Sequence, residues 1–265
     1  DLVFDLRENQ LRALHWELNG PVLTNLSPSV RVQSVRAGGS ASGRWPDLEH
    51  TGSAEAIGLE AGVARADSAR VFWSGRGLMF KELRATAQRR ASVLKLAGNG
   101  GVSREAGGLH AALECTELEL ANATNHWMLR QATRFTLDRH TNTLDLELSP
   151  TTLTSPAGRL EAEAAVHWPA QGAGTVRIAG LRSADLDDFV APDLPRLTVP
   201  EATATFAWTN GPLVFDVSSA IEWRQRGQPL VSLAGRARSD GNVIEVDSVR
   251  ADLDGAPAVE AHGRL

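Results

Sequence analysis

The sequence predicts an all-β protein: a long, curved, mainly antiparallel sheet of about fifteen strands, with one short helix. Apolar and polar residues alternate along most of the 265-residue chain, and each alternating stretch ends at a Gly, Asn, Asp or Pro turn. In the segment 213–224, Phe215 and Val217 occupy one parity and Asp216 occupies the other. Each segment is therefore expected to be a strand with one apolar and one wet face.

The first part of the chain is predicted to be a meander. A hairpin over 2–6 and 11–18 turns at Glu8-Asn9, and an irregular stretch follows up to Ser29. Glycines, prolines and asparagines punctuate the rest, because they supply positive φ or remove a ladder donor; Gly98-Asn99-Gly100-Gly101 is interpreted as such a turn. The strands that follow are expected at 30–36, 39–45, 53–60, 63–74, 78–88, 91–98, 109–121, 126–138, 142–149, 158–168 and 174–180.

The strand pattern breaks once, over residues 183–200. Leu186, Phe189 and Val190 have helical spacing, and Pro192 stops the helix. We expect a short helix near 185–190 that Asp185 caps. It should lie across one rim of the sheet, with Asp185, Asp187 and Asp188 in water, and a proline-rich connection outside the central sheet should follow it.

Five more strands are expected after the break. The apolar parity changes between Val246 and Val249, which predicts a β-bulge. We interpret residues 1–182 as a first segment and 183–265 as a second repeat of one continuous sheet. Both ends lie in strand rhythm, so we expect the chain to be a fragment of a longer protein. The five strands are 202–208, 213–224, 230–239, 242–253 and 258–265.

Composition excludes some classes of function. The net charge is −5, from 27 basic and 32 acidic residues that are scattered along the chain, which argues against a nucleic-acid surface. Cys115 is the single cysteine, so no intramolecular disulfide forms, and it is expected to be a small apolar filler. No apolar run is long enough for a membrane-spanning helix.

The sequence contains no recognisable catalytic or metal-binding motif. The seven histidines occur singly, without metal-ligand spacing. The glycines around Gly100 lack the helix that a phosphate-binding loop requires. The acids around Asp187 lack the glycine and the distal glutamate of a calcium loop. We therefore expect neither enzymatic activity nor a cofactor.

With this strand pattern established, the chain resembles the AsmA-like and TamB-like proteins, bacterial envelope members of the repeating β-groove family. The resemblance rests on the acidic-aliphatic helix and proline-rich crossover of 184–197, the small-residue strand of 38–45, and the stretch 251–265. In that family each repeat has five antiparallel strands and a crossover, which 183–265 matches. The resemblance extends over essentially the whole chain.

The resemblance implies a U-shaped sheet whose apolar concave face conducts phospholipid between the inner and outer membranes. It also implies a periplasmic location, with the full-length protein anchored in the inner membrane, and phospholipid or another acyl-chain lipid as the ligand. The alternative is a structural or adhesive β-rich surface protein, a sandwich array or a solenoid, without lipid. A sandwich would bury the same apolar residues against a second sheet, and a solenoid would show a fixed repeat.

Many positions of apolar parity are Ala or Gly, such as Ala162, Ala164 and Gly263. These would leave voids between two sheets, whereas acyl chains would fill the space, so the pattern favours a groove. The residues expected to face lipid are Leu144, Leu146, Leu148, Leu160, Val166, Trp168, Leu213, Phe215, Val217, Ile221 and Trp223.

Overall fold

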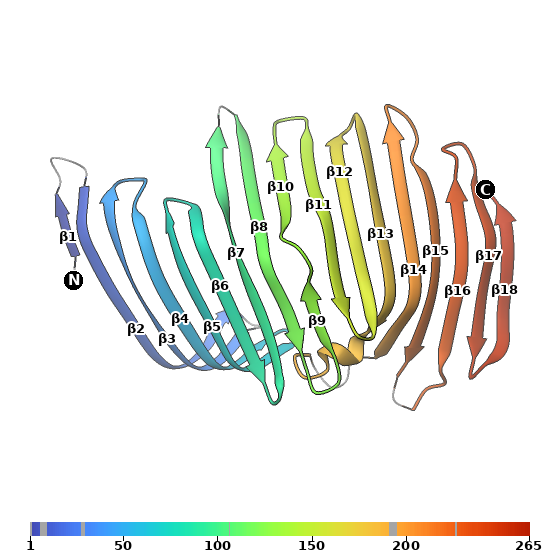
Figure 1. Cartoon of the computed structure of the whole chain (residues 1–265), viewed down its shortest axis with the longest axis horizontal. Coiled ribbons are helices and arrows are strands. Elements are labelled where there is room, and N and C mark those ends of the chain that lie inside the picture. Colours follow the sequence, from blue (N-terminus) through green and yellow to red (C-terminus); the bar gives the residue numbers. More distant parts are fainter. Residues whose placement is uncertain (1, 6–9, 28–29, 106, 191–194, 226) are drawn as a thin grey trace.

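The computed structural model describes residues 2–5, 10–27, 30–105, 107–190, 195–225 and 227–265. Within them the chain forms one large antiparallel sheet and a single short 3-10 helix (Figure 1). The all-β prediction is confirmed. No helix in the described ranges has the length and apolar character that a membrane span needs.

The strands follow one another along the chain. They are β1 Leu2–Asp5, β2 Gln10–Ser27, β3 Val30–Arg44, β4 Glu49–Ala61, β5 Ala64–Arg76, β6 Met79–Arg89, β7 Ser92–Glu105, β8 Gly108–Ala121, β9 His126–Leu129, β10 Thr133–Arg139, β11 Leu144–Ser155, β12 Gly158–Trp168, β13 Gln171–Arg182, β14 Arg196–Thr209, β15 Val214–Arg224, β16 Val231–Ser239, β17 Ile244–Leu253 and β18 Ala256–Arg264; the 3-10 helix η1 is Ser183–Leu186.

The sheet is a meander in which nearly every strand pairs with its chain neighbours. The exception is the pair β9 and β10, which lie end to end and share one position between β8 and β11. The pairing of β13 with β14 carries the sheet across the break at 183–195. Every strand pairing given for the described residues is antiparallel and in one sheet, which is the architecture of neither a solenoid nor a sandwich.

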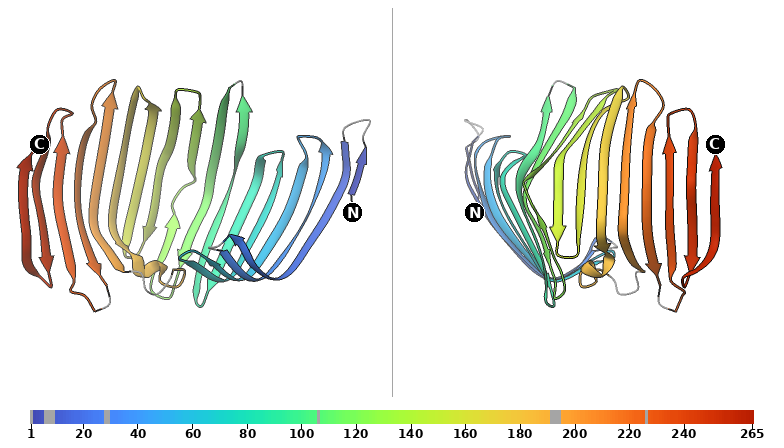
Figure 2. Two further views of the ribbon diagram at one scale, coloured as in Figure 1. Left: turned by 180° about the vertical axis from the view of Figure 1, so that it is seen from behind. Right: turned by 45° about the vertical axis from the view of Figure 1, so that its right-hand side comes forward.

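The two ends of the strands form two rims. The upper rim, at the top of Figure 1, carries the turns 45–48, 140–143 and 169–170. The lower rim carries the turns 62–63, 90–91 and 122–125 and the helix η1. Figure 2 shows that the sheet is strongly curved and that the N-terminal strands bend near their lower ends.

Several predicted boundaries are wrong. Residues 30–44 form one strand because Gly38 and Gly39 lie flat within the ladder rather than in a turn. Gly98-Asn99-Gly100-Gly101 likewise lies inside β7. The stretch 19–27, predicted to be irregular, belongs to β2. The turn at Glu8-Asn9 lies outside the described residues.

The predicted helix over 185–190 is also wrong in type and extent. Only Ser183–Leu186 is helical, as a 3-10 turn, and turns follow it. Asp185 does not cap it in water, because this side chain is 3% exposed. Pro200 lies within β14 at a register shift rather than outside the sheet. The rim position is confirmed, since the segment bonds to the lower-rim turns.

The predicted bulge in 242–253 is confirmed. Ala237 pairs with Val246 and Arg236 pairs with Ser248, so Asp247 is the extra residue. The bulge puts Ile244 and Val246 on the same side of the sheet as Val249. It therefore keeps the apolar residues of β17 in register with those of β16.

Candidate functional site

One face of the sheet is apolar across its whole width. In antiparallel pairs, directly opposite side chains point to the same side. The register can therefore be followed from strand to strand. We call the side defined by these rows the apolar face. One row runs Val102, Ala111, Leu137, Leu146, Val166, Gly172, Trp208, and the next runs Gly100, Leu113, Phe135, Leu148, Ala164, Gly174, Phe206, Phe215, Ser239.

The residues predicted to face lipid lie on strands in these and neighbouring rows, with one exception. Leu213 precedes β15 in a turn at the upper rim. None of the set is buried: Trp168 is 56% exposed and Val217 is 38% exposed. The structure therefore brings ten predicted side chains onto one face and leaves that face open to solvent.

Aromatic rings lie flat over glycines at two places on the apolar face. Trp16 and Trp73 stack with ring centroids 6.2 Å apart, above Gly39 and Gly52 of the strands between them. Phe206 and Trp208 stack at 6.0 Å beside Gly172 and Gly174. Sequence analysis missed these clusters, because a Trp and its cross-strand Gly are far apart along the chain.

The glycines in these clusters have a steric reason. A Cβ at Gly52 would lie 2.3 Å from Cζ2 of Trp73, and a Cβ at Gly172 would lie 2.1 Å from Cη2 of Trp208. Small residues here let the large rings lie against the sheet. At these two places the apolar face is thus lined by flat rings over glycines, whereas between them it carries leucines such as Leu113, Leu137 and Leu146.

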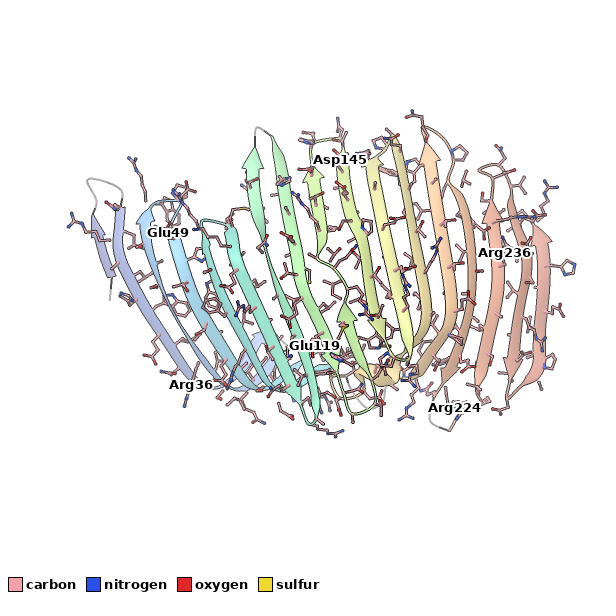
Figure 3. The ribbon with its side chains drawn as sticks, viewed as in Figure 1. Arg36, Glu49, Glu119, Asp145, Arg224 and Arg236 are labelled. Carbon is pink, nitrogen blue, oxygen red and sulfur yellow. The ribbon has the colours of Figure 1, made fainter. Side chains whose placement is uncertain are left out.

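The opposite face, which we call the polar face, carries charged side chains in cross-strand pairs. Arg236 donates to Asp216 at 2.7 Å, and this hydrogen bond lowers the pKa of the Asp216 carboxyl. Lys95 donates to Glu119 at 2.9 Å. Figure 3 shows Glu119 toward the lower rim and Arg236 among the C-terminal strands. Exposed pairs of this kind keep the face hydrated and add little stability.

Open hollows on the polar face lie between these long side chains. One of them is lined by Arg36, Glu55 and Arg70. Arg70 forms an ion pair with Glu55 at 2.8 Å. The hollow is also lined by the ring of Phe72, so it combines an aromatic side chain with the charged ones.

The segment from Ser183 to Val190, which we call the crossover, is tied to the lower rim by a buried polar cluster. The Asp185 carboxylate accepts hydrogen bonds from Nε1 of Trp127 and from Nδ2 of Asn125, both at 2.8 Å. The backbone oxygen of Asp185 accepts from Nδ2 of Asn122. Further along, Asp188 accepts from the hydroxyl of Ser92. Asp185, Asn125 and Ser92 are all buried.

The crossover then reaches β5. The backbone nitrogen of Arg65 donates to the oxygen of Phe189 at 2.8 Å, and Val190 forms a bridge with Ala64. Phe189 and Trp127 are among the few buried apolar side chains. The largest group of buried residues thus lies where the crossover meets the lower rim.

This connection determines which face is concave. Seven strand spacings separate β5 from β13, or about 34 Å in a flat sheet. Residues 183–190 form consecutive turns and, together with the bridge between Val190 and Ala64, span only about 25 Å. The crossover is therefore a chord on the inner side of a curved sheet. It bonds to Trp127 of β9, which pairs with Leu120 of β8, and Leu120 pairs with Leu94 of β7. Leu94 has the same parity as Gly100 in β7, so all three side chains lie on the apolar face. The apolar face is the concave one.

The open sheet exposes far more surface than a compact protein. The accessible area is 16956 Å², whereas a compact monomer of this mass exposes about 11,000 Å². A large apolar face that is open to solvent normally marks a binding surface. The apolar face therefore has the character of a site that another apolar molecule covers.

Two further features bear on possible chemistry: metal-ligating side chains and the thiol of Cys115. In the described part of the chain, no three His, Cys, Asp or Glu side chains lie in an arrangement that could hold a metal ion. Cys115 lies on the apolar face, where it pairs with Gly98 and Thr133, and burial raises the pKa of its thiol. A raised pKa disfavours the reactive thiolate.

No family model, curated protein or solved structure matches this chain.

Proposed function

We propose that this chain is a non-enzymatic lipid-binding segment of an envelope protein, which conducts phospholipid between the inner and outer membranes along the apolar face. One observation carries the proposal. The apolar face is concave and continuous from strand to strand, and no second sheet covers it among the described residues. Acyl chains would supply the missing volume and cover the exposed area.

The direction along which lipid would move follows from the same geometry. The two rows described above run across the strands, from β7 to β14 and from β7 to β16, and contain no charged residue. An acyl chain could pass from one strand position to the next with little change in its surroundings. Such a uniform surface favours transfer over tight, fixed binding.

Native mass spectrometry and lipid extraction of the purified chain test this proposal. The expected result is co-purifying phospholipid that is released when the protein unfolds. A chain without lipid, which also fails to crosslink a photoreactive phospholipid, would instead support the structural or adhesive role.

A further inference from the structure

Two arginines interrupt the apolar face at the upper rim. Arg104 is the last residue of β7 whose side chain lies on the apolar face, and Arg139 is the last such residue of β10. Both pair with Leu109 of β8, one from each side, and Arg139 also pairs with Leu144. Since opposite residues share a face, the two arginines lie on the apolar face with Leu109 between them.

Neither arginine has an acidic partner among the described residues. On the polar face, Arg236 and Arg238 form ion pairs with carboxylates, whereas Arg36 and Arg134 form none with the described residues. Arg104 and Arg139 are exposed, and within the described ranges no ion pair or side-chain hydrogen bond involves either of them. Their guanidinium groups therefore present unused donors at the edge of an apolar surface.

The spacing suits one phosphate group. Two strand spacings separate Arg104 from Arg139, which is about 10 Å between backbones. Both side chains are long enough to converge above Leu109, and a guanidinium binds a phosphate through two parallel hydrogen bonds. A carboxylate or a neutral headgroup would use fewer of these donors.

Below the arginines the face is apolar for a distance that suits an acyl chain. Toward the lower rim, the next two apolar rows contain Leu137 and Phe135, and β8 continues from Leu113 to Leu120. From Leu109 to Leu120 the strand runs for about 35 Å, whereas the hydrocarbon of one membrane leaflet is about 15 Å thick. The aliphatic surface is therefore longer than one acyl chain, and the crossover ends it.

We propose that Arg104 and Arg139 form a binding site for the headgroup phosphate of an acyl-chain lipid, whose tails run down the apolar face toward the crossover. This inference rests on the proposed function and adds the headgroup class and the orientation. Trp168 continues the same row beyond Leu144. Tryptophan prefers the boundary between polar and apolar surroundings, which supports a headgroup at this level.

The test compares two lipids that share their acyl chains. Binding of phosphatidylglycerol and of diacylglycerol, each delivered from non-ionic detergent micelles, is measured for the wild-type chain and for the double variant Arg104→Gln/Arg139→Gln. The double variant should lose at least about tenfold in affinity for phosphatidylglycerol and keep its affinity for diacylglycerol. Arg134→Gln is the matched control, because Arg134 is an exposed arginine on the polar face of β10; it should change neither affinity.

Each remaining outcome is informative. Unchanged phosphatidylglycerol binding by the double variant, or an equal loss in Arg134→Gln, would overturn the headgroup site while leaving the proposed function intact. If the wild-type chain binds neither lipid, both proposals fail. If inorganic phosphate alone binds as tightly as phosphatidylglycerol, the site takes free phosphate and the lipid assignment is wrong.

Discussion

The carboxylate of Asp185 accepts a 2.8 Å hydrogen bond from Nε1 of Trp127, and both side chains are buried. This contact joins the crossover, which follows β13, to the concave face of β9. It leaves the ring of Trp127 packed under the crossover and satisfies its only polar atom. The crossover is thus fastened across the lower rim, while the upper rim has no such cover among the described residues.

Replacing Asp185 should loosen the crossover. Trp127 and Asn125 both donate to one carboxylate oxygen of Asp185, and Arg182 pairs with the other at 3.4 Å. In Asp185→Asn the amide oxygen can still accept from Trp127 and Asn125, but the ion pair is lost and the amide NH2 group faces the guanidinium of Arg182. We expect a loss of about 2 kcal/mol in the free energy of unfolding, measured by urea titration. The control is Asp187→Asn. The Asp187 side chain is 45% exposed and pairs with Arg196 at 3.5 Å, so this change should cost less than about 0.5 kcal/mol. Equal effects of the two variants would show that the buried cluster does not stabilise the fold.

Adding one methyl group beneath the stacked tryptophans should disturb them. In Gly52→Ala the new Cβ would lie 2.3 Å from the ring of Trp73, which must move away from Trp16. We expect a loss of about 1–3 kcal/mol and a change in the near-ultraviolet circular dichroism of tryptophan. Gly263→Ala is the control, since a Cβ there meets nothing within 4 Å. An unchanged spectrum for Gly52→Ala would mean that the rings do not rest on the glycine.

The pair Lys95–Glu119 should make stability depend on pH. The hydrogen bond from Lys95 lowers the pKa of the Glu119 carboxyl below its ordinary value. A carboxyl with a lowered pKa contributes stability above the ordinary glutamate pKa and loses it as the pH falls through the lowered one. Carboxyl carbon NMR should show Glu119 titrating at lower pH in the wild-type chain than in Lys95→Met. The same midpoint in both proteins would contradict this explanation.

The strand pattern was predictable because it depends on local alternation. The bulge in 242–253 follows from the change in apolar parity between Val246 and Val249, and the register confirms it. The glycine-rich part of β7 was not predictable in this way. Gly98 and Gly100 are turn formers by local preference, but strands on both sides hold them in the ladder. Tertiary pairing overrides a local signal there.

The crossover shows a second limit of the sequence. Asp185 was expected in water because acidic residues at a helix start usually cap it. Its partners lie about sixty residues away, Asn125 in the turn 122–125 and Trp127 in β9. Only the folded sheet brings these donors together, so the pattern of 183–190 alone indicates a helix.

A carboxylate on the apolar face should exclude acyl chains. Val217 is 38% exposed and lies opposite Ala204 and Ala237. Glu at this position can stay hydrated in the lipid-free sheet, but acyl chains would have to desolvate it. We expect Val217→Glu to reduce phospholipid binding at least about tenfold and to leave the far-ultraviolet circular dichroism unchanged. Ser218→Glu on the polar face opposite Arg236 is the control; a similar loss of binding there would contradict a face-specific site.

The central claim, that acyl chains cover one face of the sheet, is tested most directly by scanning β15 with a photoreactive amino acid. The residue is introduced singly at each position from 215 to 222, in the presence of phospholipid. Crosslinks should alternate: strong at 215, 217, 219 and 221, and weak at 216, 218, 220 and 222. Equal labelling at all eight positions, or none at any of them, would contradict the account.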